Sequence, residues 1–112
     1  METTRQKKIS KVILKELSKI LQKETHQFLG NMLVTVTSVR VTADLSLVKV
    51  YLSVFPAKDP DHSLHILNGK KNFFRNLLAK ELRHQLRIIP EIIFFLDDSA
   101  SYAEEIDRLL EK

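Results

Sequence analysis

The 112-residue sequence contains no cysteine and only two glycines, and each shortage excludes several kinds of function. Without cysteine there is no disulfide scaffold, no thiolate zinc site and no cysteine nucleophile. Two glycines are too few for a P-loop or for the glycine fingerprint of a dinucleotide-binding fold. No apolar run approaches the roughly 18 residues of a membrane-spanning helix, and the amino terminus has no apolar signal core. We therefore expect no membrane association.

The content of hydrophobic residues is high enough for a folded core. Such residues make up 44% of the chain, whereas disordered segments are poor in them. The length suits one small domain, so we expect a single domain over residues 1–112.

The net charge of +4 conceals an uneven distribution. Residues 1–89 contain sixteen basic and seven acidic side chains, whereas residues 90–112 contain two basic and seven acidic ones. This pattern predicts a body that binds a polyanion and a separate acidic element at the carboxyl end.

Hydrophobic periodicity changes from helical to extended along the first half of the chain. Apolar residues at spacings of three and four predict a helix from Thr4 to Leu29. β-branched residues predict an antiparallel hairpin between Leu33 and Phe55, whose second strand is apolar on both faces and so suits the centre of a sheet. A break in the alternation of the first strand predicts a β-bulge near Thr37-Ser38.

The second half of the chain is predicted to return to helix. After a loop from Pro56 to Asp61, we expect Asp61 or Ser63 to cap a helix that is broken at Gly69–Asn72. The apolar spacing then resumes from Phe73 to Leu86 and ends before Pro90.

A short strand and a last helix complete the predicted fold. Ile92–Leu96 is expected to be a buried strand, and Ser101–Glu104 a capping box that opens an acidic helix. A strand that follows a helical crossover should pair in parallel. We therefore predict an α+β fold of order α-β-β-α-kink-α-β plus a short C-terminal helix, with a three-stranded mixed sheet, helices on one face and the other face partly open.

The sequence shows no arrangement typical of an enzyme. His62 and His65 have a spacing that metal ligands use, but no third ligand has an obvious place beside them. Asp97-Asp98-Ser99 precedes a predicted helix and is interpreted as a cap. There is no nucleophile elbow and no triad spacing. We expect no catalytic residue, no metal, no cofactor and no small-molecule substrate.

Basic residues recur at helical spacing in two places. Four lysines of the first helix share a face opposite its apolar stripe, which indicates either a polyanion-binding strip or an ordinary solvated face. In the helix after the break, Lys80, Arg83 and Arg87 share a second exposed face with Asn76. Both sets are candidates for contacts with nucleic-acid phosphates.

The break between the two helices carries two further lysines. In Gly69-Lys70-Lys71-Asn72, residues that tolerate a left-handed backbone flank the lysines. The segment resembles the G-x-x-G loop with which KH domains hold a nucleic-acid backbone, although its second glycine is missing. The alternative is an ordinary kink between helices.

Several motifs, taken in their order and spacing, resemble one family over roughly Arg5 to Leu110. They are Val34-Thr35-Val36-Thr37, Asp44-Leu45 with Val48-Lys49-Val50-Tyr51, Phe73-Phe74-Arg75 with Leu77-Leu78, Leu86-Arg87-Ile88-Ile89-Pro90-Glu91, and Asp97-Asp98-Ser99 with Ile106 and Leu109-Leu110. The resemblance is to the bacterial ribosome-binding factor A family, which has a type II KH fold.

The resemblance implies a non-catalytic assembly factor in the cytoplasm, expected to be a monomer. It would bind the small (30S) ribosomal subunit and its 16S ribosomal RNA, assist late maturation including 5′-end processing, and matter for growth in the cold. The family's Ala-x-Gly kink aligns with Lys70-Lys71-Asn72, where both outer residues differ, and Glu105 stands where a basic residue is expected. Two alternatives remain: a generic KH-type binder of single-stranded RNA or DNA, and a protein-interaction module that uses the open sheet face or the acidic final helix.

The candidate RNA-contacting residues combine the two basic strips with the kink. They are Lys8, Lys11, Lys15, Lys19, Lys70, Lys71, Asn72, Arg75, Lys80, Arg83 and Arg87.

Overall fold

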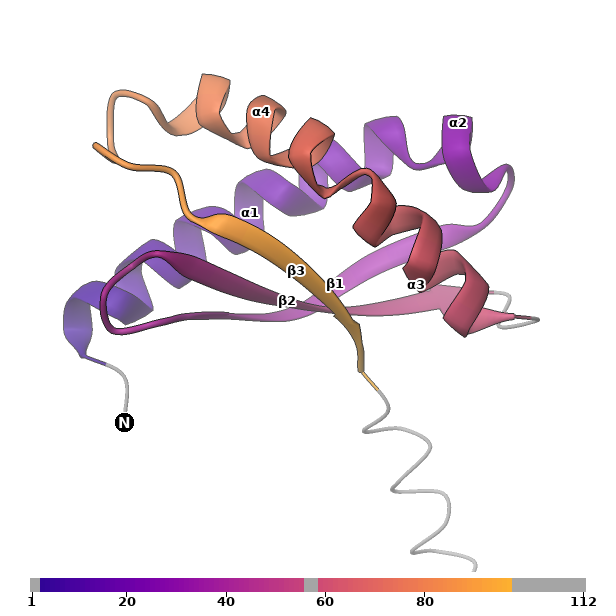
Figure 1. The fold of residues 1–112 in the computed structure, drawn as a ribbon, viewed down its shortest axis with the longest axis horizontal. Coiled ribbons are helices and arrows are strands. Elements are labelled where there is room, and N and C mark those ends of the chain that lie inside the picture. Colours follow the sequence, from indigo (N-terminus) through magenta and orange to yellow (C-terminus); the bar gives the residue numbers. More distant parts are fainter. Residues whose placement is uncertain (1–2, 56–58, 98–112) are drawn as a thin grey trace, which may run out of the picture.

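A three-stranded sheet covered by helices on one side forms the protein (Figure 1). The structure is a computed structural model that describes residues 3–55 and 59–97. In chain order the elements are α1 (Thr4–Glu24), α2 (His26–Leu29), β1 (Leu33–Val41), β2 (Leu47–Phe55), α3 (Pro60–Gly69), α4 (Lys71–Leu82) and β3 (Glu91–Leu96). The expected α+β fold is confirmed, while the capping box and last helix predicted from Ser101 lie outside the described residues.

The strands have the predicted order and directions. The sheet order is β1-β2-β3, with β1 and β2 antiparallel and β2 and β3 parallel, so β2 is the central strand. The register of β1 against β2 shifts between Val36 and Ser38, which confirms the bulge. Because of that shift, Val34 and Val36 before the bulge and Val39 and Val41 after it are all buried on the helix side of the sheet.

The core lies between this side of the sheet and the helices. α1 packs on β1, and α3 and α4 pack on β3. Ile13, Leu17 and Leu21 of α1 and Phe74 and Leu78 of α4 are fully buried there. The opposite side of the sheet, called the open face below, has no helix on it in the described part of the chain (Figure 1).

The predicted first helix is interrupted. Instead of continuing from Thr4 to Leu29, α1 ends at Glu24, and Thr25 separates it from the four-residue α2. The buried Thr25 hydroxyl donates to the Leu21 carbonyl at 2.6 Å. The Phe28 amide donates to the Thr25 carbonyl, three residues back, at 3.0 Å, so the chain tightens here without any change in its apolar spacing.

The amino terminus of α3 is capped by a residue other than those expected. The Asp59 side chain accepts from the His62 amide at 3.2 Å, and Pro60 occupies the first turn. Asp61 and Ser63, the predicted caps, both lie inside the helix. Proline suits the first helical position because its missing N–H would be unpaired there, so the cap stands directly before it.

The helix after the kink is shorter than predicted. α4 ends at Leu82 rather than Leu86. The Leu82 carbonyl accepts from the Gln85 and Leu86 amides at 2.8 and 2.9 Å, which closes the chain into a turn. Leu86 still packs against the core from this turn. In the sequence it therefore has the spacing of a residue in one more turn of helix.

Candidate nucleic-acid interface

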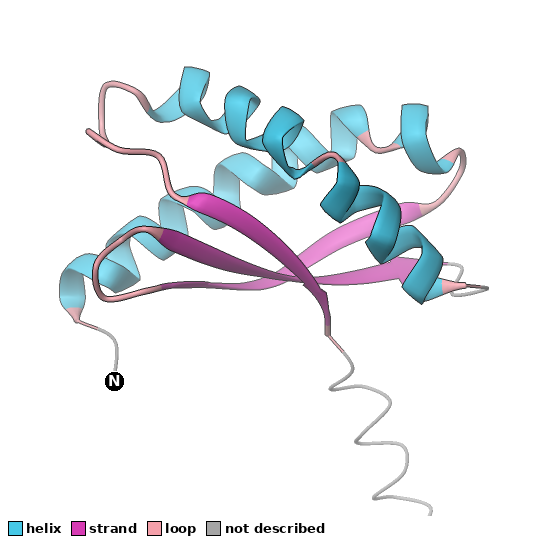
Figure 2. Cartoon of the chain, viewed as in Figure 1, coloured by secondary structure: helices cyan, strands magenta, loops and turns pink. Residues whose placement is uncertain are grey.

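A single non-helical residue makes the break between α3 and α4 (Figure 2). Lys70 has φ −109° and ψ 16°, with Gly69 ending α3 before it and Lys71 opening α4 after it. Positive φ occurs in the described residues only at Gly30 and Leu45. Gly69 and Asn72 tolerate a left-handed backbone but do not adopt one, because the bridge-region residue Lys70 is enough to turn the chain.

Two side chains tie the helices on either side of the kink to β3 and to the residues just before it. Before the kink, the Asn68 amide donates to the Phe94 carbonyl at 3.1 Å and its oxygen accepts from the Phe94 N–H at 2.9 Å. After the kink, Arg75 donates from Nε to the Pro90 carbonyl at 3.2 Å and from Nη2 to the Ile89 carbonyl at 2.9 Å. These contacts hold both helices to one segment and so set the angle between them.

Arg75 thus differs from the other predicted contact residues. It is half-buried and its guanidinium serves two main-chain carbonyls, whereas most of the remaining side chains are exposed. Its place in the structure is that of a positioning residue for the kink.

Lys70 is held over an aromatic ring. Its Nζ lies 5.4 Å from the centroid of Phe28, within the range of a cation–π contact. The Phe28 ring in turn packs edge-on against Phe73 and Phe74, with centroids 5.5 and 6.0 Å away. The short α2 helix therefore supports the kink and presents the Lys70 ammonium at an exposed position.

The main chain at the kink is open to an incoming ligand. Lys71 and Asn72 are exposed, and a Cβ built on Gly69 would meet no atom within 4 Å. Two cations next to an accessible backbone form the kind of surface on which phosphates bind.

The two predicted basic strips meet where α1 packs on α4. Lys19 and Lys23 of α1 and Lys80 of α4 line a groove of about 240 Å³ between the two helices. The rest of its lining is Glu16, Ile20, Glu24, Leu77 and Glu81. The groove therefore combines three lysines with three glutamates, and the Lys19 Nζ lies 3.9 Å from a Glu16 carboxylate oxygen. The count of charges along the sequence did not show that glutamates neutralise these lysines.

The ends of the two strips lie apart from that groove. Lys8, Lys11 and Lys15 are exposed on α1, opposite its buried stripe. Arg83 directly follows α4, and Arg87 lies in the segment before β3. The prediction that Arg87 shares a helical face with Lys80 is wrong because the helix ends first.

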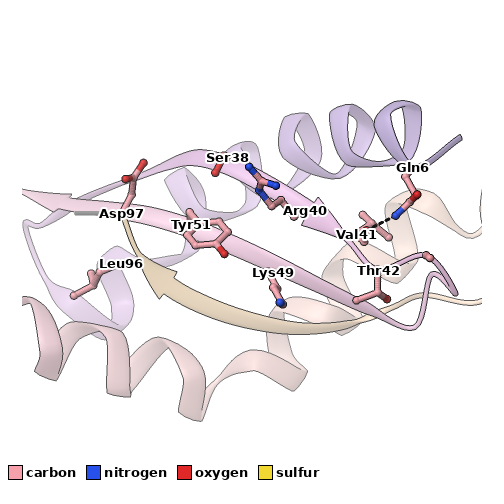
Figure 3. Close-up of a pocket in the computed structure, with 10 residues that line it drawn as sticks. Gln6, Ser38, Arg40, Val41, Thr42, Lys49, Tyr51, Leu96 and Asp97 are labelled. Atoms are coloured by element: carbon pink, nitrogen blue, oxygen red, sulfur yellow. Dashed lines mark hydrogen bonds between the residues drawn. The ribbon is translucent and has the colours of Figure 1, made fainter. Parts of the chain in front are cut away.

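Basic residues on the open face were not singled out from the sequence. Arg40 and Lys49 are cross-strand partners in the hairpin and are both exposed. With Tyr51 they line a hollow of about 780 Å³ (Figure 3). Counting outward from the turn between the two strands would have paired these residues, because antiparallel partners lie at equal distances from the turn.

The turn of that hairpin is built around a carboxylate. One Asp44 oxygen accepts from the Ser46 hydroxyl at 2.7 Å, the Thr42 hydroxyl at 2.7 Å and the Ser46 amide at 3.1 Å. These bonds, led by that from the Ser46 hydroxyl, hold the pKa of Asp44 below its ordinary value. The shift has a structural origin in a turn and marks no catalytic group.

Two kinds of site are missing from residues 3–55 and 59–97. No three His, Asp or Glu side chains converge there as metal ligands would. No helix in the same residues combines the length and apolar character of a membrane span.

The chain is similar to proteins of one family. The family model described as Ribosome-binding factor A matches residues 5–110. Ribosome-binding factor A of Cytophaga hutchinsonii is 42% identical over 112 residues, which cover 100% of this chain and 84% of that protein. The crystal structure of ribosome-binding factor A from Thermus thermophilus matches with a TM-score of 0.65 and 22% identity, covering 81% of this chain and 94% of that one. A homology model of the Thermus thermophilus protein, fitted into a cryo-EM map of a 30S complex, matches with a TM-score of 0.62 and 23% identity, covering 80% and 91%.

Proposed function

Because the chain belongs to the ribosome-binding factor A family, we propose that it binds the small ribosomal subunit through 16S ribosomal RNA and assists late maturation of that RNA at its 5′ end, without catalysis. Membership makes the chain a ribosome-binding factor. A relative fitted into the map of a 30S complex supports the small subunit as its partner. This role belongs to the cytoplasm and to ribosome biogenesis, and it needs no cofactor.

The kink between α3 and α4 is the observation that carries the proposal. Lys70 and Lys71 are exposed beside an open backbone at Gly69. Asn68 anchors the kink to β3, and Arg75 anchors it to the residues just before β3. A phosphate can therefore approach a surface whose shape is already set, so little ordering free energy is spent on binding.

Other exposed cations extend this surface along the helical layer. Lys8, Lys11 and Lys15 on α1, and Arg83 and Arg87 beyond α4, would add phosphate contacts that carry affinity but little sequence information. The groove at Lys19 and Lys80 would contribute less because three glutamates share it.

Removing the two kink lysines tests the proposal. In Lys70→Gln/Lys71→Gln we expect weaker cosedimentation with small subunits in a sucrose gradient. The dependence of log affinity on log salt should become shallower by about 0.7–0.9 for each phosphate that the variant no longer neutralises. Both side chains are exposed, so the circular dichroism spectrum should not change.

A matched control separates this surface from basicity in general. Arg5→Gln/Lys7→Gln removes the same charge from exposed positions of α1 that belong neither to the predicted strip nor to the groove, and should bind nearly as wild type. Equal weakening of subunit binding in both variants would show that net charge alone matters.

Affinity for isolated single-stranded oligonucleotides equal to that for whole subunits would instead identify a generic nucleic-acid binder.

A further inference from the structure

The open face carries a pair of cations that face each other across two strands. Arg40 on β1 and Lys49 on β2 stand directly opposite each other, and like charges in such pairs destabilise a sheet. Both cations are exposed, and one carboxylate, that of Asp97, lines the far end of the same hollow. A repulsive pair of this kind is a place where an anion binds favourably, because it relieves the repulsion.

Two stacked aromatic rings lie on the same face next to the cations. Tyr51 follows Lys49 two residues later on β2, and therefore points to the same side of the sheet. Its ring stacks on that of Phe95 with centroids 5.5 Å apart and planes at 25°. Phe95 is 37% exposed. The pair forms a flat apolar surface on strands, which is the structure on which many proteins stack nucleobases.

Cations and ring share one hollow in the surface (Figure 3). Arg40, Lys49 and Tyr51 occupy its middle, Gln6 and Thr42 one end, and Asp97 the other. Its volume of about 780 Å³ falls within the range of roughly 300–1,000 Å³ usual for small-ligand sites. The hollow can therefore receive a nucleotide rather than only an ion.

We infer that the open face binds a short stretch of unpaired RNA, with a phosphate between Arg40 and Lys49 and a base against the rings of Tyr51 and Phe95. The Cα atoms of Lys49 and Tyr51 are about 6.8 Å apart at ordinary strand spacing, a distance that one nucleotide bridges. The inference goes beyond the proposed function, because the open face lies across the sheet from the kink and either surface can bind without the other.

Binding of the purified full chain to a labelled ten-nucleotide single-stranded RNA tests the inference by fluorescence anisotropy. Arg40→Gln/Lys49→Gln should weaken binding and make the salt dependence shallower by about 0.7 for each phosphate no longer neutralised. Phe95→Leu keeps an apolar side chain but removes the outer ring, and should weaken binding about tenfold. Both effects should persist in a Lys70→Gln/Lys71→Gln background.

Phe55→Ser is the matched control on the same face. Phe55 is 71% exposed at the far end of β2, away from the cations, so its loss should leave RNA affinity unchanged. Amide signals of Ser38, Lys49 and Phe95 should shift in an NMR titration with the same RNA. Circular dichroism and thermal melting of each variant show that the fold is intact.

Two outcomes would overturn the inference. Wild-type RNA affinity in both open-face variants would exclude an RNA site there, and would leave the kink proposal standing. Wild-type RNA affinity together with lost association with small subunits would identify the open face as a docking site for a ribosomal protein.

Discussion

At Ser10 the inner side of α1 carries a hydroxyl oxygen that is buried without a hydrogen-bond partner in the described structure. The residue is 7% exposed and lies on the stripe that packs against the sheet. Water would have bonded that hydroxyl in the unfolded chain, so folding loses a bond and gains nothing in return. Ser10 is thus a local weakness on the buried side of α1.

Ser10→Ala should therefore stabilise the protein. We expect the free energy of unfolding to rise by about 1 kcal/mol, from the removed polar burial and the better helix propensity of alanine. Urea denaturation followed by circular dichroism measures the change.

Ser18→Ala provides the comparison on the same helix. It carries the same gain in helix propensity but loses the bond from the Ser18 hydroxyl to the Leu14 carbonyl at 2.7 Å. Ser10→Ala should be the more stable of the two, and the reverse order would contradict this account of Ser10.

At the scale of elements, the β1–β2 hairpin depends on an ionised side chain. Asp44 stabilises the turn as a carboxylate, and its pKa lies below the ordinary value of 3.8 because hydroxyl and amide donors favour the charged form. A group whose pKa is lowered by folding adds stability above its unfolded pKa. That contribution disappears as the pH falls through the folded pKa.

Asp44→Asn should lower stability at neutral pH and should do so less in acid. The amide keeps an acceptor oxygen but has no charge, so its bonds from Ser46 and Thr42 are weaker. Urea unfolding of both proteins over a pH series checks this, with the difference in unfolding free energy shrinking once the pH passes below 3.8. A difference that stays constant through that range would mean that the charge has no part in the turn.

The backbone conformation at the kink does not require a glycine at position 69. Gly69 has no positive φ and its Cβ position is empty, so Gly69→Ala should raise the free energy of unfolding by about 0.4–1 kcal/mol. The added methyl group would stand where a phosphate approaches in our proposal. We therefore expect a variant that is more stable in thermal melting and weaker in subunit binding.

Gly30→Ala is the contrasting substitution. Gly30 ends α2 with φ 67° and ψ −131°, a region costly for other residues, so alanine there should destabilise by about 1–3 kcal/mol. Loss of subunit binding in Gly30→Ala alone, with Gly69→Ala unaffected, would exclude a backbone contact at the kink.

For the molecule as a whole, the sheet was more predictable than the ends of its helices. The parity break between Val36 and Val39 locates the bulge, because a strand must return its apolar residues to one side. The limits at Thr25 and Leu82 were missed for physical reasons. A tightened turn after Thr25 leaves the apolar spacing unchanged, and so does Leu86, which reaches the core from outside α4.

The sequence predicts where the kink of the candidate interface lies, but not which side chains surround it. The Gly-Lys-Lys-Asn segment marks the kink because its residue types are unusual between two helices. Nothing local shows that Arg75 faces the carbonyls before β3, or that Glu81 lies near Lys19. Those neighbours depend on how the helices pack, and the periodicity of a single sequence does not reveal that packing.

The two hydrogen bonds between Asn68 and Phe94 also affect whether a second copy of the chain can pair with the edge of the sheet. β3 is a border of the sheet, and exposed borders invite another strand to extend the sheet by main-chain pairing. The Asn68 amide already occupies the N–H and carbonyl of Phe94, as a neighbouring strand would. On the opposite border, the bulge in β1 interrupts any regular ladder. A second chain that paired at either border would have to break existing hydrogen bonds or match an irregular strand.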